Sequence, residues 1–430
     1  MLREIHAKSE INNSIIFLFI IVLLLPGKTT GRLFAEDADI RDLALPDDKI
    51  EEIVLPDEEV VKEKVRPVLE GKPVEEIPEK DRHFLFLAEK LYPDQFNLFY
   101  RHGEYLAKTL KDYSQAIPRL KKAIELDSQH RDTWEILAFC HEQLKQVDEE
   151  IRCWESMRDF VENASAPADP AFKEKVFESL KRMAEENGEV MYQGKRFIIY
   201  IPQDPQWEYI IKELTDERLD EVFVQVTEDM QCIPAARTSI LILDPEEFKK
   251  VTPVSWAGGF AAGSKSMTVP ADKFKSSTPE TVLPAKPLLI HEFTHNIVFI
   301  LSGGKCPTWL NEGLATFEER KNDSYTEFIP LLAKYSITND SIPSIAEMEK
   351  KFAELKTAAM SPEVGKAYFM FYLYTRFLIE KATLSGPCHI LNALRGGVDK
   401  EQALKDITGL SVPEFERSFR NWVGKNLSGR

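Results

Sequence analysis

The stretch PLLIHEFTHNIVFILSGG, residues 287–304, decides how the rest of the chain is interpreted. It is mostly apolar, it opens with a proline, which the first turn of a helix tolerates, and it ends on glycines that can cap a helix. The pattern therefore predicts one helix over residues 287–301. His291 and His295 are four residues apart, so both imidazoles lie on one helical face, with Glu292 beside them.

The pattern HExxH is short, and it also occurs by chance on solvated helices. Here apolar residues surround it on both sides, so its polar side chains are expected to be buried with their helix. Buried polar groups without partners are costly, and a metal ion supplies a partner. The sequence therefore favours a zinc site, and a catalytic zinc needs a third protein ligand and an open fourth position.

The third ligand is expected to be Glu312, within WLNEGLA at residues 309–315. The predicted metal ligands are thus His291, His295 and Glu312. Glu292 lies where it can reach a water molecule on such an ion, which makes it the predicted general base.

These motifs resemble those of the gluzincin metallopeptidases, and most closely the peptidase MA-like group. In that group HExxH is followed by a short Gly-containing turn, by WLNEGLA and by acidic residues, here Glu318 and Glu319. The likeness continues in AYFMFYL (367–373) and ITGLS (407–411). It covers about the last 240 residues, and the paired motifs are far more specific than HExxH alone.

The resemblance implies a zinc-dependent peptidase acting on a peptide or protein, in which a Tyr or His from a later helix donates a hydrogen bond to the oxyanion. Tyr368 matches that position best, and Tyr372, one turn later, is the alternative; an apolar-core role for both stays equally open. Glu319 could orient one of the metal ligands by a hydrogen bond without binding the metal itself, but a solvated acidic face over residues 318–320 is the favoured interpretation.

Two departures from the aminopeptidase pattern narrow the expected activity. The spacing from His295 to Glu312 is shorter than in the gluzincin aminopeptidases, and their G-x-M-E-N motif for a free amine is missing. Endopeptidase action is therefore the default. The alternative is an exported protein-interaction scaffold that keeps a non-catalytic zinc site, against which the intact Glu292 argues.

Residues 188–425 are expected to form an α+β, zincin-like domain. Strands are predicted at 196–201 and 238–243, a long helix at 207–230, and a short helix after the N-cap Asp244. A turn and strand at 258–270 is the candidate edge strand beside the cleft, where an extended substrate would pair.

Residues 83–187 are predicted to be helical repeats. Residues 97–127 and 131–160 align at a 34-residue period, and the first copy resembles a tetratricopeptide repeat. The second copy departs from that pattern, with Glu150 and Met157 where small residues are expected. An unspecific helical bundle is the alternative; either arrangement offers a surface for a protein partner.

The N-terminal part is predicted to export the protein. Residues 1–35 hold an eleven-residue apolar run, typical of a signal peptide or, alternatively, an uncleaved anchor. The body would then be periplasmic, extracellular or anchored on the outer side. Residues 36–82 are acidic and proline-punctuated, which predicts a disordered linker, although a short amphipathic piece can still dock on the next domain.

The whole-chain composition excludes some partners. The formal net charge is −16, over half of it in residues 36–82, which argues against nucleic acid or an anionic membrane surface. Beyond a possible N-terminal anchor, no membrane contact is expected. The five cysteines show no CxxC spacing and are expected to be mostly buried free thiols, with a Cys140–Cys153 approach left open.

Overall fold

The structure is a computed structural model that describes residues 56–163, 169–252, 257–275, 285–321, 323, 325–338, 341–355 and 362–426. The chain divides into two compact units, Met1–Val60 and Val61–Arg430, and only residues 56–60 of the first are described. The export signal predicted for residues 1–35 and the linker up to residue 55 lie outside the described residues. No helix in the described ranges is long and apolar enough to cross a membrane.

The predicted disordered linker is wrong for its last part, which is helical. Helix α2 covers Glu58–Leu69, and two short 3-10 helices follow at Val74–Glu76 and Glu79–Asp81. Valines at 61, 65 and 68 are buried against α3 (Phe84–Leu91) and its neighbours. The acidic side chains lie on the other face of α2, so high charge and a buried apolar stripe coexist in one segment.

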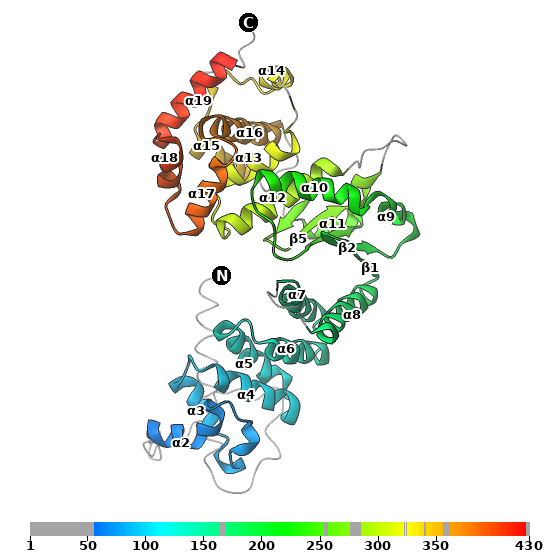
Figure 1. The fold of residues 1–430 in the computed structure, drawn as a ribbon, viewed down its shortest axis with the longest axis vertical. Coiled ribbons are helices and arrows are strands. Elements are labelled where there is room, and N and C mark those ends of the chain that lie inside the picture. Colours follow the sequence, from blue (N-terminus) through cyan, green and yellow to red (C-terminus); the bar gives the residue numbers. More distant parts are fainter. Residues whose placement is uncertain are drawn as a thin grey trace, which may run out of the picture. The chain divides into compact units, whose positions relative to one another are not determined.

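A series of helices follows, as predicted for residues 83–187. Consecutive helices pack against one another in the order α4 to α8 (Figure 1). Their bounds are Phe96–Tyr105 for α4, which continues as a π-helical turn at Leu106–Leu110, Tyr113–Leu126 for α5, Arg131–Gln143 for α6, Val147–Asn163 for α7 and Pro170–Glu186 for α8.

The structure shows how the two departures from the repeat pattern are accommodated on α7. Met157 is fully buried and fills the space that a small residue would leave. Glu150 is also buried, but its carboxylate accepts hydrogen bonds from Arg182 Nη2 of α8 at 3.0 Å and from Trp154 Nε1 at 3.3 Å. Glu150 therefore attaches α7 to α8.

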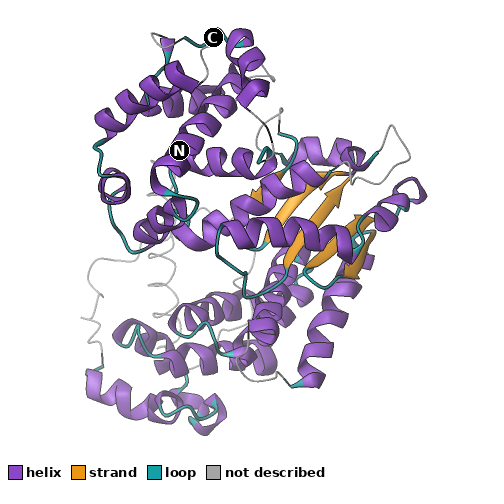
Figure 2. Ribbon diagram, turned by 45° about the horizontal axis from the view of Figure 1, so that its top comes forward, coloured by secondary structure: helices purple, strands orange, loops and turns teal. Residues whose placement is uncertain are grey.

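One mixed five-stranded sheet follows the helices, in the order β1-β2-β3-β5-β4 (Figure 2). The three central strands are parallel to one another, whereas β1 and β4 run antiparallel at the edges. The strands are β1 Glu189–Gln193, β2 Phe197–Pro202, β3 Thr238–Leu243, β4 Phe260–Ala262 and β5 Ser266–Pro270. Strand β1 was not predicted, and the segment predicted at 258–270 is a hairpin with β4 at the edge.

The connections between strands are mainly helical. The long helix predicted at 207–230 is broken into a 3-10 turn (Pro205–Trp207), α9 (Tyr209–Glu213) and α10 (Asp216–Asp229). The break occurs because the Thr215 side chain caps α10 by accepting from the Arg218 backbone N–H. Asp244 caps α11 (Pro245–Val251) as predicted, and a 3-10 helix at Ala271–Phe274 follows β5.

Both faces of the sheet are buried. On β2, Phe197, Ile199 and Ile201 belong to the core shared with α10 and α12, whereas Ile198 and Tyr200 belong to the core of helices α4 to α8. Because alternate residues of a strand point to opposite faces, β2 is apolar on both faces of the sheet. The helical segment therefore covers one face of this sheet.

Helix α12, Lys286–Ser302, carries the HExxH pattern and ends at Gly303, which adopts a left-handed conformation with φ 62°. The helix and its glycine cap were both predicted. The helices after α12 complete the hydrophobic core of this part of the chain. They are α13 Thr308–Glu319, α14 Tyr325–Lys334, α15 Ile345–Leu355, α16 Pro362–Ala382, α17 Gly386–Arg395, α18 Lys400–Thr408 and α19 Val412–Asn426.

Helices α13 and α16 approach closely at Gly313. A Cβ at this position would lie 2.1 Å from Thr375 Oγ1 and 2.6 Å from the Phe371 carbonyl oxygen. The α16 backbone and the buried Thr375 side chain cannot move aside without a cost in stability, so only glycine fits here. This glycine follows Glu312 directly, so the close helix contact fixes the position of Glu312 too.

Replacing Gly313 with alanine should lower the free energy of unfolding by about 1–3 kcal/mol, because the new methyl group overpacks the α13–α16 contact. Urea unfolding followed by circular dichroism measures this loss. Gly258→Ala is the control, since a Cβ there would meet only Leu288 Cδ1 at 3.5 Å. Equal stability of the two variants would contradict the packing argument.

Candidate metal and catalytic site

The structure brings His291, His295 and Glu312 together. Glu312 Oε2 lies 3.7 Å from His291 Nε2 and 3.5 Å from His295 Nε2, and the three potential ligand atoms all lie within 4.8 Å of one another. The two histidines come from one face of α12, and the glutamate comes from the middle of α13. This convergence follows from the packing of α12 on α13.

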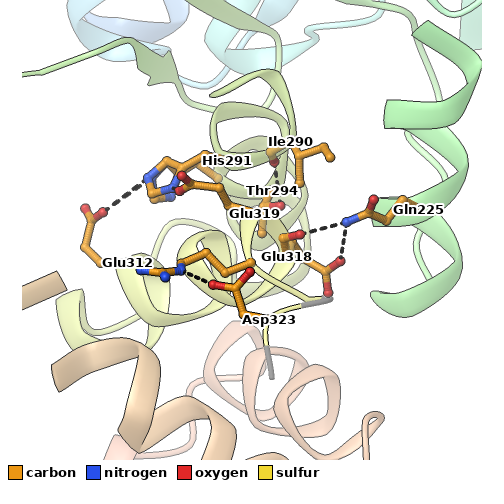
Figure 3. Close-up of polar contacts among 10 residues, drawn as sticks. Gln225, Ile290, His291, Thr294, Glu312, Glu318, Glu319 and Asp323 are labelled. Atoms are coloured by element: carbon orange, nitrogen blue, oxygen red, sulfur yellow. Dashed lines mark hydrogen bonds and ion pairs between the residues drawn. The ribbon is translucent and has the colours of Figure 1, made fainter. Parts of the chain in front are cut away.

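The other nitrogen of each imidazole has its own partner on α13. Glu319 Oε2 lies 3.0 Å from His291 Nδ1, and Asn311 Oδ1 lies 3.0 Å from His295 Nδ1. Figure 3 shows Glu312 and Glu319 both directed toward the His291 ring. Because these oxygens accept a hydrogen bond from Nδ1, they leave each Nε2 as the nitrogen that faces Glu312.

Burial and the neighbouring charges both shift the pKa values of the residues in this cluster. Burial lowers the pKa of His291, but the nearby carboxylates of Glu312 and Glu319 outweigh it and raise the pKa to about 10. Burial raises the pKa of Glu312, yet the two imidazoles hold it well below its usual range. The Glu312 carboxylate therefore stays ionised and attracts positive charge to this point.

Glu292 lies in the same site but is not part of the ligand trio. Its side chain is only 5% exposed, and burial raises its pKa above the usual value. The backbone of Gly259 lies against it: a Cβ at residue 259 would be 2.9 Å from Glu292 Oε1. A carboxyl group with a raised pKa is suited to accept and return a proton near neutral pH.

A cleft of about 350 Å³ opens onto these residues. The β4 segment (Gly259, Phe260, Ala261 and Gly263) lies along one side, and Phe352 and Tyr368 lie on another. Val298 and Phe299 of α12 add an apolar surface to it, and Phe299 is 43% exposed. Cys306 also lines the cleft, and burial raises the pKa of its thiol well above the usual value.

Of the two candidate tyrosines, Tyr368 lies at the cluster and Tyr372 does not. The ring centroid of Tyr368 is 6.0 Å from that of His291, and burial together with the nearby Glu312 and Glu292 carboxylates raises its pKa. The hydroxyl therefore keeps its proton and can donate it in a hydrogen bond. Tyr372 is fully buried among aromatic rings, and its hydroxyl accepts from Arg376 Nη1 at 2.7 Å.

The favoured prediction of a solvated acidic face over residues 318–320 is wrong. Glu318 is 1% exposed, and Gln225 Nε2 donates to its backbone oxygen at 2.7 Å and to its carboxylate at 3.4 Å (Figure 3). Burial, with the nearby Asp229 charge, raises the pKa of Glu318 to about 8. The neighbouring Glu319 is the partly exposed residue that contacts His291. Sequence spacing alone does not distinguish these two adjacent acids.

The residues present fit a zinc ion. Glu312 Oε2 is buried and has no hydrogen-bond partner among the described residues, so one strong acceptor remains unsatisfied. Two imidazole nitrogens and one carboxylate oxygen are a ligand set of catalytic zinc sites. With Zn–ligand distances of about 2.0–2.2 Å, tetrahedral ligands lie roughly 3.3–3.6 Å apart. The two distances to Glu312 Oε2 are close to this spacing.

Comparison with known families agrees with this geometry. Residues 224–425 match the family model described as the Peptidase MA superfamily. The match supports a metallopeptidase-like domain of the MA type in this segment. The match begins within α10, so β1 and β2 precede it. The resemblance in the sequence extends further towards the N-terminus, over about the last 240 residues. A search of curated proteins finds no match to the chain.

Glu319 should strengthen metal binding, because it fixes the tautomer and the orientation of the His291 ring. Glu319→Ala is expected to weaken zinc affinity about 10–100-fold, as is typical for partners of metal-bound histidines. Competition with a chromogenic chelator measures this change. The control is Glu246→Ala, which removes a 75%-exposed carboxylate that pairs with Lys249. Equal zinc affinities in the two variants would exclude this role.

Glu318 should make the stability of the domain depend on pH. A carboxyl group whose pKa is raised by folding keeps its proton to higher pH than in the unfolded chain, so stability falls from pH 4.5 towards pH 8. In Glu318→Gln this loss should be absent. Urea unfolding at pH 5 and at pH 8 measures the difference. Between these two pH values the free energy of unfolding of the natural protein should fall by at least about 1 kcal/mol more than that of the variant. Parallel pH profiles would rule out a raised pKa.

Proposed function

We propose that the protein is a zinc-dependent peptidase, acting as an endopeptidase on peptide or protein substrates. The observation that carries the proposal is the convergence of His291, His295 and Glu312, with the buried Glu292 beside them, at one cleft. The match of residues 224–425 to the Peptidase MA superfamily supports it. Neither a structural zinc site nor a binding surface requires a buried carboxyl base at that place.

The three ligands would hold the ion through His291 Nε2, His295 Nε2 and a Glu312 oxygen. When bound, zinc lowers the pKa of a coordinated water and polarises a carbonyl group of the substrate. The protein supplies the fixed geometry for this chemistry. Glu319 and Asn311 hold the two imidazoles in the required orientation, and the α13–α16 contact at Gly313 fixes Glu312.

Glu292 would accept the proton of the attacking water and then pass it to the leaving amine. Burial suits it to both roles, because a raised pKa brings the carboxyl group closer to neutral pH. Tyr368 would donate a hydrogen bond to the oxygen on which negative charge develops. Its hydroxyl remains protonated beside the carboxylates of the site, which is the state that donation requires.

An extended peptide would lie along β4, the edge strand beside the cleft. Edge strands offer unpaired backbone groups to an incoming chain, so they bind many sequences through their main chains. The exposed ring of Phe299 would contact substrate side chains. The chain lacks the motif that recognises a free amine in related aminopeptidases, which supports cleavage within a chain rather than at its end.

We further infer that helices α3 to α8 are tetratricopeptide-like repeats that recruit a substrate or a protein partner, and that the protein is exported. The pairing of α4 with α5 and of α6 with α7 supports the first inference. The apolar run near the N-terminus supports the second. The site of action would then be periplasmic, extracellular or the outer side of a membrane.

Elemental mass spectrometry of protein purified without added metal tests the site. About one zinc per chain is expected, and it should be lost in His291→Ala and Glu312→Ala. Zinc retained in Glu312→Ala would show that the third ligand is wrong.

Glu292→Gln separates a peptidase from a scaffold with a non-catalytic zinc. The variant should keep its zinc and lose about 10²–10⁴-fold in kcat on a quenched-fluorescence peptide, because the general base is gone. Glu246→Gln is the control, because Glu246 is an exposed glutamate on α11 that pairs with Lys249. Equal turnover in the two variants would exclude Glu292 as the base.

A further inference from the structure

The β4–β5 hairpin borders the cleft but is a weak element by itself. Only three residue pairs join its strands, from Phe260–Thr268 to Ala262–Ser266, and a short hairpin of this kind is marginally stable alone. Its position nevertheless determines where an extended peptide would lie, because Gly259 at its start contacts Glu292. Strand β5 is held in the sheet by its five pairs with β3, so the turn and β4 are the parts that depend on further contacts.

One such contact comes from α12. Asn296 directly follows His295, and its side chain is fully buried. Its Nδ2 atom donates to the backbone oxygen of Gly263 at 2.7 Å and to that of Ser266 at 3.0 Å. One amide group thus holds both ends of the turn, residues 263–265, and attaches it to the helix that carries the histidines.

The other contact comes from α7, in the helical segment. Lys265, within the turn, forms an ion pair with Asp159, and the Lys265 backbone oxygen accepts from the Ser239 N–H at 2.8 Å. The adjacent Arg158 is 1% exposed and donates to Ser239 Oγ at 2.7 Å. Helix α7 therefore contacts both the turn and the strand next to it.

We propose that Asn296 and the Asp159–Lys265 ion pair are positioning elements of the cleft, which makes helix α7 a working part of the peptide-binding site. The inference rests on the proposed function, in which β4 pairs with the substrate. None of these residues belongs to the ligand trio or contacts it through a hydrogen bond. Loosening the hairpin should therefore weaken peptide binding and leave zinc binding unchanged.

Lys265→Met tests the proposal, with Lys195→Met as a matched control. Lys195 lies in the turn of the β1–β2 hairpin at the other edge of the sheet, and it pairs with Asp220 of α10. The two lysine side chains are similarly exposed, at 49% and 56%. Lys265→Arg keeps the charge and should behave like the natural protein.

Hydrogen–deuterium exchange with mass spectrometry is the first readout. Lys265→Met should exchange faster over residues 258–270, while Lys195→Met and Lys265→Arg should not. The second readout is hydrolysis of a quenched-fluorescence peptide. Lys265→Met should raise KM about tenfold, with a smaller change in kcat and an unchanged zinc content.

Equal exchange over residues 258–270 in Lys265→Met and Lys195→Met would overturn the proposal, as would an unchanged KM with faster exchange. A natural protein that binds zinc but hydrolyses no peptide would instead overturn the proposed function. In that case the exchange difference still decides whether α7 holds the hairpin, so the two failures are distinguishable.

Discussion

The interaction on which the domain depends is the pairing of one largely buried carboxylate with two largely buried imidazoles across the α12–α13 contact. Helix α12 is apolar almost throughout, and burying it carries His291, Glu292 and His295 away from water. Glu312 from α13 meets the two histidines at that depth and keeps its negative charge there. Because buried charges without partners are costly, the two helices have little freedom to separate or to slide.

Other features of the domain serve this arrangement. The glycine after Glu312 lets α16 approach until its backbone supports α13, and Tyr368 of α16 thereby reaches the histidines. The sheet supports α12 from the opposite side, through the core that Phe197 shares with Phe293. The cleft is therefore formed where three elements meet: α12, the α13–α16 pair, and the β4–β5 hairpin.

The sequence predicted the chemical groups of the site better than their surroundings. The ligand trio follows from the four-residue spacing of the histidines and from a likeness in the NEGLA segment. The contacts that support the site were harder to predict from the sequence, because they depend on how the helices pack. Glu319 had been considered as an orienting residue, but adjacent Glu318 has the same chemistry, and only the structure shows which is buried. Asn296 was missed, although a polar amide directly after HExxH, inside an apolar run, was an available signal.

The boundary of the family match does not coincide with a boundary of the fold. The match starts within α10, yet the sheet needs β2 between β1 and β3, and β2 belongs to the preceding segment. Its Ile198 and Tyr200 are covered in turn by the helices before it. A gene fragment encoding the matched residues alone would leave β3 as a new, unprotected sheet edge, which invites pairing between molecules. The matched segment is thus smaller than the sheet it contributes to, and the N-terminal helices cover a face of that sheet and contact the hairpin beside the site.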